Sequence, residues 1–495
     1  MIDTAKKKQQ KISLKILRYD NNEVTMTRPT DTDHPLEEIA QWVSERPANW
    51  PDTALLTASN ATIDTIACMI VGSADPAIAK LTALVSQWGQ GPATLVGQAG
   101  ALSAPWAALI NGAAAHVLDF DDNFDPAKAH ASAVLIPALL AVGEQENCTI
   151  GAYLDAYIVG LQVMGHVGQA VNPFHRNRGW HATATMGAIG AAAGAARLLK
   201  LNAEQSAHAI SMATSRAGGF MSQFGTDTKP LHAGFAASGG VQSALMARAG
   251  LTAGRETLDG PNSLRTLLVG QDVEDRAADM VGTAEHGQSV DFKPGRIADP
   301  LHILAYGLKV KRFPNCGSVH RALDGLLELR EKHSLTAETV DHVLVRAPAS
   351  HLRNLMYEDP VTPAEAKFCL EYNLSVGLLN GSVGLADFEP EAIARTDIRA
   401  LFPKIRKEYV EKLESEFPTE VHVTTLSGQT LSTSIKMPMG SRQMPLTRQQ
   451  LFAKFDDCVA KTAKWPAATQ LRQILGEMNS DQPLSSMTAL LKRET

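Results

Sequence analysis

Apolar residues recur at intervals of three and four along most of the chain between Pro35 and Gly307. This spacing places them on one face of a helix and therefore predicts an almost wholly helical region. The clearest segments are 37–43, 54–71, 77–88 and 131–144. Asp75 and Pro76 stand directly before the third segment, as an N-cap residue and a proline in the first helical turn would.

Two further segments, 181–199 and 232–249, combine many alanines with three glycines each. A glycine inside a helix costs roughly 1 kcal/mol relative to alanine, so several in one helix indicate close helix–helix contact rather than helix propensity. No Lys, Arg, Asp or Glu interrupts 180–196, so that helix should be buried nearly all round. We expect both segments to form central helices of a helical core.

The pattern changes after residue 314. Residues 340–347 alternate as in a strand, and 420–425 and 431–435 flank Gly428 as in a hairpin. Helical spacing is found at 319–332 and 364–379, and it returns at 447–459 and 468–474 after Pro438, Gly440 and Pro445. The last two helices are too small to bury a core alone, so we expect them to pack on the first domain.

These patterns predict a mainly α protein with a large all-helical domain over 34–308 and a smaller α+β domain over 309–445. The C-terminal helices over 446–495 return to the helical domain. Residues 1–33 form a polar leader, with a cluster of lysines, that we expect to be disordered. A chain of 495 residues exceeds the usual size of a single core, which agrees with more than one domain.

Composition narrows the function. The net charge is −6 and no face is obviously basic, which argues against nucleic acid as a partner. The five cysteines are far apart and form no C-x-x-C pair, which argues against disulfides, zinc and iron–sulfur clusters. No signal peptide fits the start, and we expect no apolar stretch to reach bilayer length without interruption, the nearest being 186–199. We therefore expect a cytoplasmic protein without a membrane partner.

Three carboxylates, Asp119, Asp121 and Asp122, stand within four positions where an apolar helix should end. His116 and His130 lie on either side of them. One interpretation is a helix exit whose acids are solvated. The other is a functional site, since charged groups between two strongly apolar helices need partners.

Three other segments carry candidate chemistry. His181 would stand at the first turn of the Ala/Gly helix, where the helix dipole favours a neutral imidazole and a bound carboxylate, although it could simply cap the helix. Lys229, in a Gly/Thr loop, is suited to bind an anion. Lys311 and Arg312 at the domain junction could bind a carboxylate or be merely solvated. Cys316 is interpreted as lining the pocket, because the sequence shows no partner base.

In this order, the segments resemble the MmgE/PrpD family, which includes 2-methylcitrate dehydratases, cis-aconitate decarboxylases and iminodisuccinate epimerases. The resemblance runs from about Pro35 to Leu491 and rests on HVLDFDD, AHASAVLIPALLA, GWHATATMGAIGAAAGAARLL, GTDTKPLHAGFAA, KRFPNCGSVH and EAKFCLEYNLSVGLLNG. It implies a large helical domain with an α+β lid, a homodimer, and no metal or cofactor.

The resemblance to decarboxylase-like members assigns site residues to the matching positions Asp119, His130, His181, Lys229 and Lys311, with the family's lid tyrosine at Tyr372. Asn123 stands where those decarboxylases can have a hydroxyl residue, and Cys316 stands where animal-type members have a histidine. We expect Asn123 and Cys316, with the two lysines, to contact the substrate. Because of these departures the substrate does not carry over.

The expected function is that of a lyase that transfers a proton at the carbon next to a carboxylate of a small di- or tricarboxylate, by decarboxylation or dehydration. Lys229 and Lys311 would support the developing enediolate. His181 or His130 would move the proton, and Asp119 would orient a histidine or hold its charge. The lid would exclude water. The alternatives are an epimerase of an iminodisuccinate-like dicarboxylate and, more remotely, a ligand-binding protein that has kept the fold.

Overall fold

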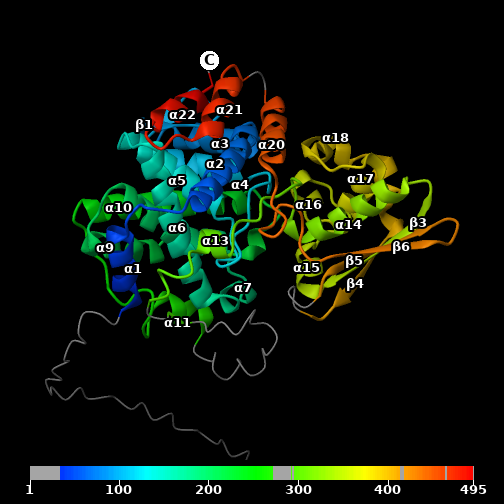
Figure 1. The fold of residues 1–495 in the computed structure, drawn as a ribbon, viewed down its shortest axis with the longest axis horizontal. Coiled ribbons are helices and arrows are strands. Elements are labelled where there is room, and N and C mark those ends of the chain that lie inside the picture. The colour runs from blue at the N-terminus through cyan, green and yellow to red at the C-terminus, as the bar shows by residue number, and fades with distance from the viewer. Residues whose placement is uncertain (1–33, 271–290, 293–294, 413–416, 463–464, 494–495) are drawn as a thin grey trace, which may run out of the picture.

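The computed structural model describes residues 34–270, 291–292, 295–412, 417–462 and 465–493. They form two lobes, a larger helical lobe and a smaller lobe that holds both helices and a sheet (Figure 1). We refer to them as the helical lobe and the α+β lobe. The leader over 1–33, expected to be disordered, lies outside the described residues.

The helical lobe confirms the predicted helix-rich region. Its helices before the α+β lobe are α1 Pro35–Glu45, α2 Asp52–Gly72, α3 Pro76–Val85, α4 Ala104–His116, α5 Ser132–Gln145, α6 Ile150–Val171, α7 Phe174–Asn177, α8 Ala182–Leu198, α9 Ala203–Thr214, α10 Thr228–Arg248, α11 Leu264–Val269 and α13 His302–Ala305, with the 3-10 turn η1 Met221–Gln223. The side chain of Asp75 accepts a hydrogen bond from the backbone of Ala77, as an N-cap should. One departure is a short hairpin of β1 Gln90–Thr94 and β2 Ala101–Leu102, which follows an α3 that ends at Val85.

Glycines do bring the central helices together. A Cβ built on Gly190 of α8 would lie 2.7 Å from the Cβ of Met164 in α6. A Cβ on Gly240 of α10 would lie 2.5 Å from the Cβ of Ala191 in α8. Neither position could hold a larger side chain without separating the helices. This close packing confirms the interpretation of the two glycine-containing segments.

Helix α2 corrects one expectation from the sequence. Asp52–Gly72 is long and apolar enough to cross a bilayer by length and composition, whereas the stretch expected to come nearest was 186–199. In the structure 72% of its apolar window is buried against other parts of the chain. Such burial is typical of a central helix in a helical core.

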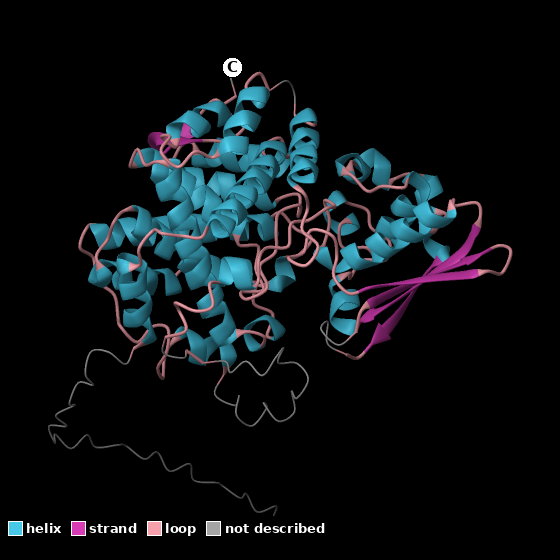
Figure 2. Ribbon diagram, in the orientation of Figure 1, coloured by secondary structure: helices cyan, strands magenta, loops and turns pink. Residues whose placement is uncertain are grey.

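The α+β lobe is built on a four-stranded sheet in the order β4-β3-β5-β6, which lies along one side of the lobe (Figure 2). The strands are β3 Val340–Pro348, β4 Ile405–Val410, β5 Thr419–Thr425 and β6 Thr430–Ile435. The β5–β6 hairpin and β3 were predicted, whereas β4, which pairs parallel to β3, was not. Its central residues Arg406, Lys407 and Glu408 give no alternating apolar pattern.

Helices α14 Gly317–His333 and α17 Leu370–Asn380 pack on this sheet and on each other. The single helix predicted over 364–379 is two helices in the structure. The short helix α16 Pro363–Ala366 is separated from α17 by the turn 367–369. The lobe is completed by the short elements α15 Ala349–Asn354, η3 Leu385–Phe388, α18 Pro390–Ile393, α19 Thr396–Arg399 and η4 Phe402–Lys404. The break matters because it places the turn 367–369 toward the helical lobe.

The C-terminal helices lie on the helical lobe (Figure 1). They are α20 Arg448–Ala460, α21 Ala468–Glu477 and α22 Ser485–Thr488, followed by η5 Ala489–Leu491. Leu451 and Phe455 of α20 are buried in the same core as α2. Lys454, between them, forms a buried ion pair with Asp64 of α2 at 2.6 Å. It also donates to the backbone carbonyls of Phe120 and Lys311 at 2.7 and 3.0 Å.

Replacing Lys454 by Met is expected to lower the free energy of unfolding by about 3–5 kcal/mol, because the Asp64 carboxylate would stay buried without its partner. Chemical denaturation measures this change. Lys461→Met provides a control, since Lys461 contacts Glu389 only at 3.8 Å on the surface and should change stability by less than about 1 kcal/mol. Equal losses in both variants would contradict a stabilising role for the buried pair.

Candidate active site

The acidic segment lies between α4 and α5, two helices with few exposed residues. His116 is the last residue of α4, and Asp119 has a left-handed backbone with φ of 54°. Asp119 is 4% exposed, and Asp121 and Asp122 are fully buried. The interpretation as a solvated helix exit is therefore wrong. Ionised carboxylates at such depth need partners, and each of these three aspartates has them.

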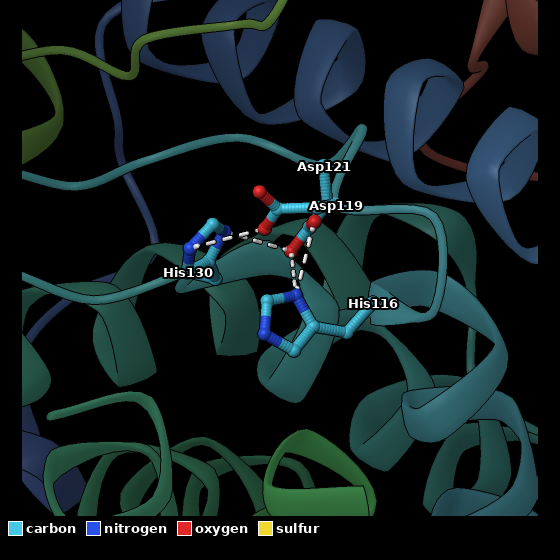
Figure 3. Close-up of side chains that lie close together, drawn as sticks. All are labelled: His116, Asp119, Asp121 and His130. Carbon is cyan, nitrogen blue, oxygen red and sulfur yellow. Dashed lines mark hydrogen bonds and ion pairs between the residues drawn. The ribbon is translucent and has the colours of Figure 1, made fainter. Parts of the chain in front are cut away.

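Asp121 is shared by two histidines (Figure 3). Nδ1 of His116 lies 3.1 and 3.0 Å from the two carboxylate oxygens of Asp121. Nδ1 of His130 lies 3.1 Å from Oδ2 of the same carboxylate. The two imidazole rings are 4.4 Å apart, centre to centre. A single carboxylate therefore holds both rings, as in the carboxylate–histidine pairs that fix an imidazole for proton transfer.

Both rings are neutral near pH 7. Burial lowers the pKa of His116 to about 4, and it also lowers the pKa of His130, against the raising effect of the Asp121 charge. Burial raises the pKa of Asp121, but the two histidines hold it well below its usual range. Asp121 is thus a carboxylate that accepts a hydrogen bond from Nδ1 of the neutral His116 ring and lies 3.1 Å from Nδ1 of His130.

This arrangement leaves Nε2 of each ring as the site of its lone pair. Nε2 of His116 is buried and has no hydrogen-bond partner among the described residues. Nε2 of His130 lies 3.3 Å from the side-chain amide nitrogen of Asn123, which can only donate. We therefore assign the proton to Nδ1 in both rings. Each ring can then accept a proton at Nε2, as a general base must.

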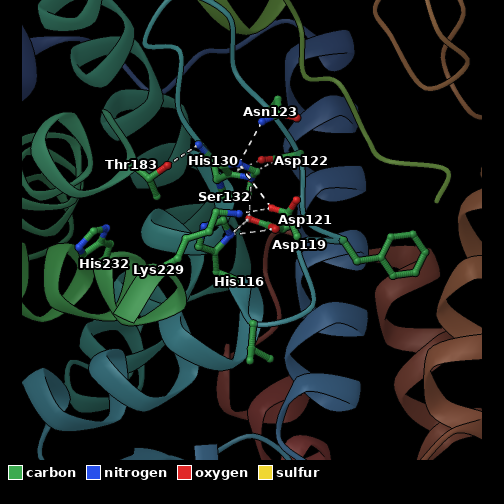
Figure 4. Close-up of polar contacts among 12 residues, drawn as sticks. His116, Asp119, Asp121, Asp122, Asn123, His130, Ser132, Thr183, Lys229 and His232 are labelled. Carbon is green, nitrogen blue, oxygen red and sulfur yellow. Dashed lines mark hydrogen bonds and ion pairs between the residues drawn. The ribbon is translucent and has the colours of Figure 1, made fainter. Parts of the chain in front are cut away.

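Asp119 contacts two ammonium groups, and Figure 4 shows one of them, that of Lys229. Nζ of Lys229 and of Lys311 lie 2.5 and 3.1 Å from its Oδ1, whereas Nε2 of His130 lies 3.8 Å away. Lys311 also donates to the backbone carbonyl of Asp119 at 2.6 Å. Burial raises the pKa of Asp119, but the two lysines hold it well below its usual range. The contacts expected to orient a histidine are thus made mainly by Asp121.

Lys229 lies inside α10, not in a loop before it. The helix begins at Thr228, four residues earlier than predicted, so Lys229 stands in its first turn. Its ammonium lies 5.3 Å from the ring centre of Phe224 and 4.9 Å from that of Phe368. Phe224 belongs to the helical lobe and Phe368 to the α+β lobe. The lysine is therefore held between aromatic rings of both lobes and points at Asp119.

His181 forms the next layer of the cluster. It is the N-cap residue of α8, one position before the predicted first turn, and its side chain makes no capping hydrogen bond. Its ring stacks on that of His116 with 5.9 Å between the centres. Its Nδ1 lies 2.8 Å from Nδ1 of His232 in α10, so one of these two nitrogens donates and the other accepts. Burial holds the pKa of His181 well below its usual range and lowers that of His232 to about 4. Both rings are neutral near pH 7.

Asp122 supports the cluster from behind. It accepts hydrogen bonds from the backbone N–H and the hydroxyl of Ser132. The Ser132 hydroxyl in turn lies 2.7 Å from the hydroxyl of Tyr157. Burial raises the pKa of Asp122 to about 7. This acid is therefore tied to the start of α5 and to α6, and it does not face the lysines. We interpret it as an anchor for the loop that carries Asp119 and Asp121.

The α+β lobe contributes three residues close to the cluster. The first is Cys316, which directly precedes Gly317. A Cβ built on Gly317 would lie 3.1 Å from Oδ1 of Asn123. Burial raises the pKa of the Cys316 thiol, and the charges of Asp119, Lys311 and Lys229 reach it. A protonated thiol fits the interpretation of Cys316 as a lining residue. Lys367 and Phe368, in the turn before α17, complete this side.

Tyr372 does not reach this cluster. It is fully buried in the core of the α+β lobe, where its ring packs near Phe388 and Phe402. Its hydroxyl donates to the backbone carbonyl of Asp387. The hydroxyl of the predicted catalytic tyrosine is therefore engaged in a hydrogen bond within the α+β lobe. The side of α17 that carries Tyr372 is turned toward η3 and not toward the helical lobe.

Tyr372→Phe is accordingly expected to keep turnover within a few-fold of the wild type. It should lower the free energy of unfolding by about 1 kcal/mol, because one buried hydrogen bond is lost. Steady-state kinetics and chemical denaturation measure the two effects. A loss of turnover by orders of magnitude at unchanged stability would restore Tyr372 to the site.

His116, Asp119, Asp121 and His130 each offer one ligand atom, all within 4.8 Å of one another, which is a spacing that could hold a metal ion. The lysines argue against this use. Lys229 and Lys311 already contact Asp119, so a cation would have to bind beside two positive charges. A polyanion fits this surrounding better than a metal ion does.

The structure brings five of the residues predicted from the sequence to one place: Asp119, His130, His181, Lys229 and Lys311. No role was assigned from the sequence to His116, Asp121, His232 and Lys367. His116 and Asp121 were visible as part of the acidic segment, but their five-residue separation shows nothing about contact. Only the distances from its carboxylate to the two Nδ1 atoms identify Asp121 as the acid beside both rings.

Comparisons with known proteins agree with this architecture. The model of the MmgE/PrpD N-terminal domain matches residues 37–276, and the model of the MmgE/PrpD C-terminal domain matches residues 313–480. A cis-aconitate decarboxylase of Homo sapiens is 28% identical over 78% of this chain and 79% of its own length. A cis-aconitate decarboxylase-like protein of Aspergillus oryzae is 24% identical over 95% of this chain and 100% of its own. A cis-aconitate decarboxylase of Aspergillus terreus is 24% identical over 84% of this chain and 88% of its own.

Proposed function

We propose that this chain, which belongs to the MmgE/PrpD family and is a lyase, decarboxylates a small unsaturated tricarboxylate of the cis-aconitate type. The observation that carries the proposal is the pairing of two neutral histidines on Asp121 beside two ammonium groups on Asp119. The first pair can transfer protons, and the second can bind carboxylates. The named relatives supply the substrate class.

In the proposed reaction, the carboxylate on the CH₂ carbon of the substrate leaves as CO₂, and its bonding electron pair shifts through the neighbouring double bond to the carbon at the far end. The charge on that carbon spreads into the carboxylate it carries, as an enediolate. Lys229 and Lys311 would stabilise the enediolate, because their ammonium groups are buried and need not reorient. The ammonium of Lys229 also lies between the rings of Phe224 and Phe368, which shield it from water and so strengthen the attraction.

The carbon must then gain a proton. We assign this transfer to His116 or His130, whose Nε2 atoms carry the lone pairs. A polyanion bound beside these rings favours their protonated form, so one histidine takes a proton from solvent and delivers it to carbon. Asp121 would stabilise the imidazolium while it exists. His181 would support the His116 ring by stacking on it.

The test is incubation in D₂O with cis-aconitate, 2-methylcitrate and iminodisuccinate, followed by NMR and measurement of released CO₂. CO₂ release from cis-aconitate, with deuterium at the newly protonated carbon, is the expected result. An arm with a chelator should give the same rate, since no step uses a metal. No reaction with any of the three, in folded protein, would overturn the proposed function.

The other two compounds distinguish related chemistries. Loss of water from 2-methylcitrate would identify a dehydratase, and deuterium exchange with inversion of iminodisuccinate would identify an epimerase. Either result without decarboxylation of cis-aconitate would keep the proton-transfer site but replace the proposed reaction. The homodimer implied by the family resemblance remains a proposal that light scattering of the purified chain can test.

A further inference from the structure

Lys367 is a buried ammonium group where the two lobes meet. It caps α16 of the α+β lobe and is 6% exposed. Its Nζ lies 3.4 Å from the backbone carbonyl of Val117 in the helical lobe, which is a long hydrogen bond. Among the residues that the structure describes, it forms no ion pair within 4.0 Å. A buried ammonium without a carboxylate partner is costly, and such a group calls for an explanation.

The neighbouring buried lysines differ from Lys367 in this respect. Lys229 and Lys311 both contact Asp119, and Lys454 contacts Asp64. These three are held by the protein's own acids. Lys367 alone in this group has its charge met only by a distant carbonyl.

The turn that carries Lys367 faces the cluster. The backbone carbonyl of Lys367 accepts a hydrogen bond from the backbone of Cys316 at 3.1 Å. The next residue, Phe368, lies against the ammonium of Lys229 and near the ring of Phe224. Lys367 also senses the charges of Asp119, Lys229 and Lys311. It is therefore a part of the same surroundings, on the side that the α+β lobe provides.

We propose that Lys367 binds a carboxylate of the substrate, so that the substrate is a polycarboxylate held by cations of both lobes. The inference rests on the proposed function and deepens it, since it names a further binding residue for that site. Lys229 and Lys311 would bind the carboxylate next to the reacting carbon. Lys367 would bind a second carboxylate and bring the lobes together around it.

Binding of a carboxylate by Lys367 depends on the pH. Burial lowers the pKa of Lys367 to about 8, with Asp119 and Asp75 raising it and Lys229 and Lys311 lowering it. A bound carboxylate raises this pKa. Affinity for a polycarboxylate should therefore be greatest below pH 8 and should fall as the pH rises above it, where free Lys367 loses its proton.

The experiment measures binding without turnover. Tricarballylate carries three carboxylates but neither a double bond nor a hydroxyl group, and its binding can be followed by calorimetry. Lys367→Met is expected to weaken binding by roughly 10- to 100-fold, since a charged hydrogen-bond partner is lost. It should also remove the decline of affinity above pH 8. Its Tm in the absence of ligand should equal or exceed that of the wild type, because an unpaired buried charge is removed.

Lys404→Met is the matched control. Lys404 lies in the same lobe and also donates to backbone carbonyls, those of Ala337 and Val340, but it is remote from the cluster. This variant should bind tricarballylate as the wild type does. If Lys367→Met binds tricarballylate normally, or if it fails to fold, Lys367 has a structural role and the proposal is overturned.

The two proposals fail in different ways. Wild-type turnover of cis-aconitate with an unchanged KM in Lys367→Met would keep the proposed function and overturn the role of Lys367. Binding of tricarballylate that depends on Lys367, without turnover of any tested compound, would keep the role of Lys367 as a carboxylate ligand and overturn the proposed function. A wild type that neither binds nor turns over any of these acids would overturn both.

Discussion

Asp121→Asn is expected to lower kcat by about 10²- to 10⁴-fold while the chain stays folded. The carboxylate meets Nδ1 of both His116 and His130, and each ring needs an acceptor there to keep its lone pair on Nε2. An amide offers one oxygen and one NH₂ group. With its NH₂ group in the place of Oδ2, it presents a donor to both rings; with the NH₂ group in the place of Oδ1, it presents a donor to His116. A ring that meets a donor changes tautomer or turns away. A charge that would stabilise the imidazolium is lost as well.

The matched control for this variant is Asp125→Asn. Asp125 belongs to the same loop but contacts Lys309 near the surface at 2.8 Å, so its replacement should leave kcat close to the wild type. Steady-state kinetics of both variants, with circular dichroism to show that they are folded, measure the difference. Equal kcat values in Asp121→Asn and the wild type would remove Asp121 from the proton-transfer machinery.

The pH profile adds a readout that a purely structural role would not change. Burial lowers the pKa of His116 to about 4, and the Asp121 charge acts in the opposite direction. In the wild type, kcat/KM should fall as the pH rises through about 4, because His116 then loses the proton that it delivers to carbon. Without the Asp121 charge the pKa of His116 is lower still. In Asp121→Asn this decline should therefore lie at a lower pH than in the wild type.

The sequence was sufficient for most of the helical lobe, since apolar spacing and glycine placement act within one helix. Gly190 and Gly240 indicated close packing in the sequence, but not which helices they contact. The sheet was harder to predict. Strand β4 is a polar edge strand whose pairing with β3 spans some sixty residues, and such contacts leave no local pattern. The break at 367–369 was hidden by a continuous helical spacing.

The site shows the same limit at the scale of side chains. Three aspartates in four positions predicted a functional segment, but not which acid meets which base. The left-handed backbone of Asp119 turns the chain there, so that Asp119 points to the lysines and Asp121 to the histidines. Non-glycine residues adopt this conformation rarely, and no residue type signals it reliably. Tyr372 was misplaced for a related reason, since a position in a motif does not show the direction of its side chain.

Lys229→Met is expected to lower kcat by about 10²- to 10³-fold, as removal of one preorganised group that stabilises an oxyanion does. The ammonium is fixed by Asp119 at 2.5 Å and by the rings of Phe224 and Phe368, so it is in place before charge develops on the substrate. Methionine keeps the unbranched stem and its packing. Asp119 retains Lys311 at 3.1 Å, so the variant does not leave a buried carboxylate unpaired.

Whether Lys229→Met changes kcat or KM distinguishes two roles for Lys229. An interaction that is stronger in the transition state than with the bound substrate lowers kcat and kcat/KM together, whereas one that is equal in both raises KM alone. We expect the first result for Lys229, and the second for Lys367, whose carboxylate is remote from the reacting carbon. Lys309→Met, which removes a neighbouring lysine that contacts the exposed side of Asp125, should change neither constant. A higher KM with unchanged kcat in Lys229→Met would make Lys229 a binding residue and leave Lys311 as the group that supports the enediolate.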